Sequence, residues 1–354
     1  RQVCRLVQPS ARGVQFGLAG PLSMSEPAAL SLPTPKDVTE AARRLHGHVL
    51  RTPVLRNDAL DDLAGAELFF KCENLQLTGS FKIRGATNRL LQIPQDRRAG
   101  GVVAFSSGNH AQGVARAARN FGMPALIVMP SDAPSIKVDG VRRDGAEIRF
   151  YDRETESREA IAQGEAELRE AVLVPSFDDP YIIAGQGTAG VEFGQQMRDA
   201  NKPLDHILCC AGGGGLITGL ALGYRTFDPD TQIWTAEPEL HDDWRRSLAA
   251  GQIQTNEPGT RSICDAILTP APGEITWALG KELLAGGRAV SDDAIREAMR
   301  LAFRHLKLVL EPGGAAALAC ALYDLPEEAR GKRVGVVLSG GNVDPEQYAR
   351  ILTG

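Results

Sequence analysis

Residues 71–90 read K-C-E-N-L-Q-L-T-G-S-F-K-I-R-G-A-T-N-R-L, and the fold can be worked out from this stretch. The residues at 67–71 are apolar and β-prone, which predicts a strand. A polar turn with a glycine follows, and Ser80 is a good N-cap for a helix that we expect to begin at about that residue. Lys82 then lies in the first turn of the helix, with Phe81 beside it.

The position of Lys82 has two interpretations. The N-terminal end of a helix carries the positive end of its dipole, so an ordinary surface lysine prefers the last turn. A lysine in the first turn, next to an aromatic ring, would have a depressed pKa and could act as an amine nucleophile. The alternative is a solvated lysine near a cap, since most lysines are surface residues. The spacing alone leaves both open.

Composition indicates an ordinary globular chain. Its 354 residues suggest two lobes, with 43% hydrophobic and 23% charged residues. A net charge of −5 argues against nucleic acid or an anionic membrane as the main partner. No apolar run reaches the roughly 18 residues of a membrane span. The six cysteines lack zinc-site spacing and lie mostly in apolar runs, which predicts buried, reduced thiols and a cytoplasmic location.

After Pro94, short apolar segments alternate with helical patterns. This alternation predicts a parallel sheet with right-handed crossovers. Strands are expected at 101–105, 125–129, 147–151, 206–210, 232–236 and 333–338. The Pro- and Gly-rich segment 251–275 is predicted to be loop. Residues 1–23 contain three arginines and no acid before Met24, so we expect a disordered leader or extension there.

Four consecutive glycines, Gly212–Gly215, lie between a predicted strand and a helix. Their backbone N–H groups and the helix N-terminus would form an anion site. The loop lacks the lysine of a Walker motif, so it suits a monophosphate better than a nucleoside triphosphate. A tight turn is the alternative, although four glycines are costly for a turn alone.

Polar residues also follow other predicted strands. The segment S-S-G-N-H at 106–110 could bind a carboxylate or simply cap a helix. Ser339, in S-G-G-N, could form a hydrogen bond with a ring nitrogen or cap a turn. The carboxylates Glu237, Asp242 and Asp243 could hold Mg²⁺ or Ca²⁺, or form a solvated acidic loop. In open α/β sheets ligands bind at the carboxyl ends of strands, and the combination is what a pyridoxal phosphate enzyme needs.

At these residues the sequence resembles the fold-type II pyridoxal phosphate enzymes, in particular the serine/threonine dehydratase and serine racemase group. The resemblance covers roughly residues 30–350. It implies a two-lobed, open, twisted parallel-sheet α/β fold like that of the tryptophan synthase β subunit. The matching motifs occur in the order and spacing of the family, at 71–86, 106–115, 184–188, 211–216, 311–319 and 338–344.

The resemblance implies a role for each motif around pyridoxal 5'-phosphate. Lys82 would be the Schiff-base lysine, and the phosphate would lie on Gly212, Gly213, Gly214, Gly215 and Leu216. The remaining cofactor contacts would come from Phe81 beside the ring, Asn109 at the pyridine hydroxyl and Ser339 at the ring nitrogen.

Substrate and metal residues are implied in the same way. The substrate carboxylate would be bound by Ser106, Asn109, His110 and Arg158. Ser107 would be the acid/base opposite Lys82 in the racemase branch. A metal site for Mg²⁺ or Ca²⁺ would use Glu237, the His241 carbonyl and Asp243. The segment V-P-S-F at 174–177 lacks the His-Pro expected of the group, which affects the substrate side of the site.

The implied activity is conversion of L-threonine or L-serine to 2-oxobutyrate or pyruvate and ammonia, by α,β-elimination. Serine racemase and 3-hydroxyaspartate dehydratase are alternatives on the same site. A non-catalytic ligand-binding protein is an alternative of another class. The expected domains are a large cofactor-binding domain at 24–103 and 174–354 and a small mobile domain at 104–173, in a homodimer. We also expect a short form without a carboxy-terminal regulatory domain.

Overall fold

The strand that precedes Lys82 belongs to a six-stranded sheet with the order β1-β2-β10-β7-β8-β9. All neighbouring pairs are parallel except β1–β2. Strands β7 and β10 are almost continuously apolar and buried, as expected of parallel strands covered on both faces. The strands are β1 Val54–Leu55, β2 Glu67–Cys72, β7 His206–Cys210, β8 Gln232–Pro238, β9 Gly286–Val290 and β10 Arg333–Leu338.

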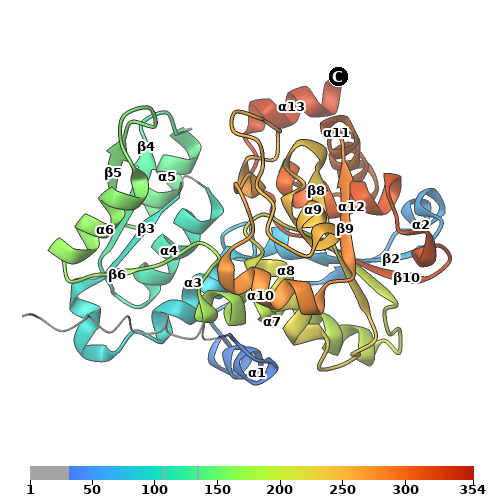
Figure 1. Cartoon of the computed structure of the whole chain (residues 1–354), viewed down its shortest axis with the longest axis horizontal. Coiled ribbons are helices and arrows are strands. Elements are labelled where there is room, and N and C mark those ends of the chain that lie inside the picture. The colour runs from blue at the N-terminus through green and yellow to red at the C-terminus, as the bar shows by residue number, and fades with distance from the viewer. Residues whose placement is uncertain (1–31, 107, 134) are drawn as a thin grey trace, which may run out of the picture. The chain divides into compact units, whose positions relative to one another are not determined.

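A second sheet has four parallel strands in the order β5-β4-β3-β6. Its strands are β3 Val102–Phe105, β4 Ala125–Pro130, β5 Glu147–Tyr151 and β6 Val172–Leu173. Alternate side chains face opposite sides. Val102 and Ala104 pack with helices α4 (Asn109–Asn120) and α5 (Ser135–Arg143), whereas Val103 packs with α6 (Arg158–Leu168) (Figure 1).

The other helices flank the larger sheet and its connections. They are α1 Pro35–Arg44, α2 Asp58–Ala64, α3 Lys82–Leu91, α7 Pro180–Asp199, α8 Gly215–Tyr224, α9 Asp243–Ala250, α10 Glu274–Leu283, α11 Asp292–Leu301, α12 Pro312–Tyr323 and α13 Pro345–Thr353. Short 3₁₀ turns occur at Glu73–Leu75, Gln95–Gly100, Glu239–His241, Asp265–Ile267 and Glu327–Ala329, and a π turn at Ala302–Leu306. Helices α7 and α8 pack closely at Gly219 of α8. A Cβ atom at this position would lie 2.2 Å from the carbonyl oxygen of Ile183 in α7, which is too close for a side chain.

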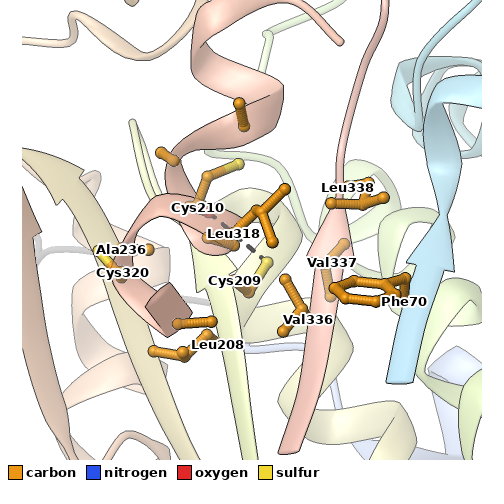
Figure 2. Packing of buried hydrophobic residues seen from close by; sticks show 14 of the residues in the cluster. Phe70, Leu208, Cys209, Cys210, Ala236, Leu318, Cys320, Val336, Val337 and Leu338 are labelled. Atoms are coloured by element: carbon orange, nitrogen blue, oxygen red, sulfur yellow. Dashed lines mark hydrogen bonds between the residues drawn. The ribbon is translucent and has the colours of Figure 1, made fainter. Parts of the chain in front are cut away.

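The main hydrophobic core lies between α12 and strands β7 and β10. Figure 2 shows Leu318 and Cys320 of α12 near Leu208 of β7 and Val336 of β10. Five cysteines of the described chain are buried free thiols, namely Cys72, Cys209, Cys210, Cys264 and Cys320. This confirms the predicted buried thiols for those five residues.

Some boundaries differ from the sequence predictions. Helix α3 begins at Lys82, and Ser80 does not cap it, because the Ser80 backbone forms an antiparallel bridge with Gly340. Helix α6 begins at Arg158, since Ser157 is its N-cap.

Helix α10 was missed because its cap comes from a distant part of the chain. Asp178 accepts hydrogen bonds from the backbone N–H groups of Glu274, Ile275 and Thr276. The residue before the helix, Gly273, has no side chain to cap it, so the local sequence does not indicate where the helix starts. Strand β9 and helix α13 were also missed.

The computed structural model describes residues 32–354 apart from 107 and 134. The expectations for residues 1–23 and for Ser107 lie outside the described residues. Both sheets belong to one compact unit. The division into a large cofactor-binding domain and a small mobile domain stays a prediction. In the described part of the chain, no helix is both long enough and apolar enough to cross a membrane.

Candidate active site

Lys82 is the first residue of α3, and the chain before it is fixed to the end of β10. The Phe81 N–H donates to the Ser339 carbonyl at 3.2 Å, next to the bridge between Ser80 and Gly340. The Lys82 ammonium is half-buried, donates to the Ser176 carbonyl at 2.8 Å and lies 5.3 Å from the Phe81 ring centre. Burial lowers the pKa of Lys82 to about 8. A neutral amine is therefore accessible near physiological pH.

Ser339 and Cys210 lie together at the carboxyl ends of neighbouring strands. Ser339 follows β10, and Cys210 is the last residue of β7. Both are buried, and the Cys210 thiol donates to Ser339 Oγ at 3.1 Å. Because the Ser80–Gly340 bridge joins the two segments, Ser339 and Lys82 are brought to the same edge of the sheet.

The tetraglycine loop fits a phosphate cradle. Gly214 has φ +95°, and a Cβ there would lie 2.2 Å from the Trp244 ring, whereas one on Gly213 would lie 2.3 Å from Phe177. Helix α8 begins at Gly215 without a side-chain cap, so its first N–H groups remain free to bind an anion. Trp244 also holds the loop, because its Nε1 donates to the Gly212 carbonyl at 2.6 Å. Leu216, the second residue of the helix, is buried.

A chain of side-chain hydrogen bonds connects Asn109 to two other segments. Asn109 Nδ2 donates to Glu311 Oε1 at 2.6 Å, and Asn342 Nδ2 donates to Asn109 Oδ1 at 2.7 Å. Burial raises the pKa of Glu311 to about 8, so this acid is mainly protonated at neutral pH. Sequence reasoning gave no role to Glu311. The available signal was an acid at the start of α12, directly before P-G-G.

His110 is buried in the same loop as Asn109. Its Nε2 lies 2.9 Å from the Val174 carbonyl, which requires Nε2 to carry the proton, and its Nδ1 has no partner among the described residues. Burial, with Lys82, lowers the pKa of His110 to about 3. A substrate carboxylate would therefore contact a neutral imidazole at His110. At position 174, where the resemblance leads one to expect a histidine, Val174 contributes its backbone carbonyl.

Arg158 lies at the surface and Ser106 lies in the loop. Ser106 Oγ accepts from the Gly108 N–H at 3.2 Å. Arg158 is exposed, pairs with Glu159 at 2.8 Å and stacks over Phe105, the residue before Ser106, at 5.5 Å. The structure places Ser106 directly after β3, and Asn109 and His110 in the first turn of α4. Among the described residues, Arg158 is connected to this turn through Phe105.

The predicted metal ligands Glu237 and Asp243 are both buried at the start of α9. Glu237 accepts from the Trp244 and Arg245 N–H groups, each at 2.9 Å, and thereby caps that helix. Burial, with Asp243 nearby, raises the pKa of Glu237, and burial raises that of Asp243 to about 7. Asp243 Oδ2 has no hydrogen-bond partner among the described residues, which suits a cation ligand. The described residues contain no cluster of three or more His, Cys, Asp or Glu side chains able to hold a metal, so the site stays a prediction.

Comparison with known proteins finds relatives that match about nine tenths of the chain. The chain is 46% identical over 319 residues to the L-threo-3-hydroxyaspartate ammonia-lyase of Pseudomonas sp, which covers 90% of this chain and 98% of that protein. It is 39% identical over 324 residues to the serine racemase of Schizosaccharomyces pombe, with 92% and 98% covered. The structure of maize serine racemase aligns with a TM-score of 0.85 at 38% identity, with 90% and 96% covered.

These comparisons confirm the predicted fold. The α/β architecture with its two parallel sheets is the fold type II of pyridoxal phosphate enzymes, as the sequence motifs implied. A family model described as "Pyridoxal-phosphate dependent enzyme" matches residues 45–340, from the residue after α1 to the turn after β10. With a half-buried lysine, a glycine cradle and a strand-end serine at one edge of the sheet, this chain belongs to the pyridoxal-phosphate dependent enzyme family.

Proposed function

We propose that this enzyme is an ammonia-lyase that converts L-threo-3-hydroxyaspartate to oxaloacetate and ammonia. The 46% identity to an ammonia-lyase of that name supports this substrate above L-threonine and L-serine, which the sequence motifs first suggested. The observation that carries the proposal is a cation beside the site. A hydroxyaspartate has a second carboxylate that threonine and serine lack, and it needs a positively charged partner.

Lys137 is the cation best placed for this role. Its ammonium pairs with Asp265, a contact that joins α5 on the smaller sheet to the turn at Asp265–Ile267. Lys137 is largely buried, whereas Asp265 is exposed. Both lie within electrostatic range of the Glu311 carboxyl, to which Asn109 donates: Asp265 raises the pKa of Glu311 and Lys137 lowers it. We infer that the substrate β-carboxylate takes the place of Asp265 at Lys137.

The chain supplies the other roles with its own residues. When bound, pyridoxal phosphate supplies a conjugated ring that acidifies the substrate Cα–H bond. Ser106 and Asn109 orient the α-carboxylate, and the neutral amine of Lys82 removes the Cα proton. The β-hydroxyl then leaves as water, with the proton that Lys82 removed, and the released enamine tautomerises to an imine that hydrolyses to the 2-oxo acid and ammonia. Gly212–Gly215 would hold the phosphate throughout.

A substrate panel tests the proposal. The purified holoenzyme should form oxaloacetate from L-threo-3-hydroxyaspartate with a higher kcat/KM than it forms 2-oxobutyrate from L-threonine or pyruvate from L-serine. Lys137→Met should lower kcat/KM for hydroxyaspartate about tenfold or more, the effect of losing a charged hydrogen bond. Because L-serine has no β-carboxylate, its turnover is the internal control. Faster turnover of threonine than of hydroxyaspartate would reject the substrate assignment.

Serine racemization is the second candidate function. It is favoured by the 39% identity to a serine racemase. The reaction would need a second base opposite Lys82, and Ser107 is the residue that the family motif indicates. Chiral analysis of serine recovered from the reaction separates the activities, because Ser107→Ala should stop racemization and spare elimination. A protein that binds the cofactor and turns over none of these substrates would be the non-catalytic alternative.

A divalent cation at Glu237 and Asp243 remains a proposal. Two buried carboxylates near each other favour Mg²⁺ or Ca²⁺, and the His241 carbonyl would complete the chain's ligands. Adding either ion to chelator-treated protein should raise its melting temperature, and Asp243→Asn should remove that increase. An equal increase in the variant would reject this site.

Assembly and cellular compartment are proposed as well. A homodimer follows from the family resemblance and is tested by light scattering of the purified protein. A cytoplasmic location is supported by the five buried free thiols, which do not need an oxidising compartment.

A further inference from the structure

Helices α9 and α10 each provide one side chain that binds the tetraglycine loop. Trp244 of α9 donates its Nε1 hydrogen to the Gly212 carbonyl at 2.6 Å. Thr276 of α10 donates its hydroxyl to the Gly213 carbonyl at 2.7 Å, a shorter contact than the 3.2 Å to the Gly273 carbonyl. Both side chains are fully buried. Two carbonyls of the loop are therefore bound by side chains from outside it.

The direction of both hydrogen bonds is unambiguous. An indole nitrogen only donates, and a backbone carbonyl only accepts. The peptide bonds of the loop are trans, so the carbonyl and the N–H of one peptide unit point in opposite directions. The Gly212 carbonyl points to Trp244, and the N–H of the same unit, on Gly213, therefore points away from it. In the same way, Thr276 turns the N–H of Gly214 away from itself.

The two donors lie on one side of the loop. A Cβ built on Gly214 would collide with the Trp244 ring and would lie 2.9 Å from the Thr276 Cβ. Helix α10 packs beside α8 on this side (Figure 1). The Gly214 carbonyl accepts from the N–H and the hydroxyl of Thr218, at 3.0 and 2.8 Å. All three carbonyls from Gly212 to Gly214 are thus occupied by donors of the protein.

The N–H groups of the same peptide units have no such partner. Within residues 32–354 as the structure describes them, the N–H groups of Gly213, Gly214 and Gly215 donate to no protein acceptor, although all three residues are buried. Buried donors without an acceptor are unfavourable, and free N–H groups at the start of a helix attract an anion. The loop therefore presents its donors on the side away from Trp244 and Thr276.

We propose that Trp244 and Thr276 are positioning residues that orient the Gly213 and Gly214 N–H groups toward the cofactor phosphate. The inference rests on the assignment of the phosphate to the tetraglycine loop. It is independent of which amino acid is the substrate.

The reason lies in what the loop can do without these donors. A buried carbonyl that loses its donor needs another one. Glycine backbone is free to rotate, so the unit between Gly212 and Gly213, or the next one, can turn its carbonyl toward the phosphate side. An anion there would then meet an oxygen where the native loop presents an N–H. Loss of either donor should therefore weaken binding of the phosphate in particular.

The test compares a ligand that carries the phosphate with one that lacks it. Purified apoprotein is titrated with pyridoxal 5'-phosphate and, separately, with pyridoxal, and both dissociation constants are measured by equilibrium dialysis. The phosphorus-31 chemical shift of bound pyridoxal phosphate is the second readout. No substrate is used, so the outcome does not depend on the proposed activity.

Each donor has a variant that removes its hydrogen bond and keeps most of its shape. Trp244→Phe retains an aromatic ring beside Gly214, and Thr276→Val retains the branched side chain. Thr276→Ser restores the hydroxyl. Trp277→Phe is the matched control, since the Trp277 ring lies 6.0 Å from that of Trp244 and its indole donates to no loop carbonyl among the described residues.

The proposal predicts a loss that is specific to the phosphate. In Trp244→Phe and Thr276→Val the dissociation constant of pyridoxal phosphate should rise about fivefold to tenfold, as expected for one lost hydrogen bond. The phosphorus shift should move, and the dissociation constant of pyridoxal should remain that of the wild type. Thr276→Ser and Trp277→Phe should match the wild type in every measurement.

An equal rise for pyridoxal phosphate and for pyridoxal would overturn the proposal, because it would indicate a general loss of structure. So would an unchanged phosphorus shift in both variants, or a failure of Thr276→Ser to keep the wild-type dissociation constant. If Trp244→Phe does not fold, the comparison of Thr276→Val with Thr276→Ser decides in the same way.

Discussion

Two lysines eleven residues apart in the same stretch have opposite surroundings. Lys71 is fully buried, and its ammonium donates to Glu192 at 2.9 Å, to the Thr52 carbonyl at 2.9 Å and to Gln196 at 3.0 Å. Lys82 is half-buried and donates only to the Ser176 carbonyl. Burial lowers the pKa of both. At Lys71 this effect is opposed by Glu192, which forms an ion pair with it, whereas at Lys82 it is opposed by Cys210 and Glu311, and neither of these forms an ion pair with Lys82 among the described residues. Burial with a carboxylate partner favours a structural ammonium, whereas burial without one favours a neutral amine.

The acids next to the two lysines differ in the same way. Lys71 belongs to a buried ion network, which we define as Lys71, Glu73, Arg84 and Glu192. Although burial alone would raise the pKa of Glu73, Arg84 at 2.7 Å brings it below its usual range. On the side of Lys82, burial raises the pKa of Glu311 to about 8. The network therefore consists of charged groups, two cations that balance two anions. The candidate active site, in contrast, is built from neutral groups.

The largest expected effect is on Lys82. Lys82→Ala removes the proposed base and should lower the rate of keto acid formation on the order of 10³-fold or more. Its unfolding transition should stay close to that of the wild type, because Lys82 forms no ion pair within residues 32–354 as the structure describes them. Both are measured on the purified protein, by product assay and by urea denaturation. Retained activity would show that Lys82 is not the base, and would contradict the contrast between a catalytic amine at Lys82 and a structural ammonium at Lys71.

Arg84→Met should have the largest effect on stability. It leaves the fully buried Glu73 without its cation, and breaking a buried pair costs about 3–5 kcal/mol. Urea denaturation gives the free energy of unfolding. Lys71→Met is the matched control and should cost less, because Glu192 still pairs with Arg84 at 2.8 Å. Equal losses in the two variants would contradict this network.

Glu311→Gln tests whether the acid near Lys82 is neutral. Its pKa in the folded protein is about 8, above the ordinary 4.5. The stability from the protonated acid is therefore present below pH 4.5 and lost as the pH rises through about 8. Glutamine does not titrate, so the variant should gain at least ~1 kcal/mol relative to wild type between pH 5 and pH 9. A difference that stays constant with pH would mean that Glu311 is already ionised.

The smallest effect concerns the rate at which the apoprotein takes up its cofactor. Only the neutral amine can react, so the rate should rise with pH and level off above the Lys82 pKa of about 8. Stopped-flow absorbance at several pH values measures it. A rate that continues to rise toward pH 10 would indicate an ordinary lysine, exposed to water and without a lowered pKa.

The sequence predicted what depends on local patterns. The strands around β2, β7 and β10, the glycine loop and the position of Lys82 in a first helical turn all follow from neighbouring residues. It did not predict contacts made between distant segments. The Asp178 cap of α10, the bond between Asn109 and Glu311, and the pairing of Arg84 with Glu192 all join residues that are ordinary polar positions when considered separately.

Ser80 illustrates the same limit at a single residue. Its local context favours an N-cap, yet the bridge to Gly340 takes its backbone, and its hydroxyl is left buried without a partner. A partner strand from the end of the chain decides where α3 begins. That boundary matters, because it fixes the orientation from which Lys82 enters the site.

The most direct test of the central claim is to identify the lysine that binds the cofactor. The holoenzyme is reduced with borohydride, digested and analysed by peptide mass spectrometry. The account predicts a pyridoxyl group on Lys82 and none on Lys71. A label on Lys71, or on any lysine other than Lys82, would contradict it.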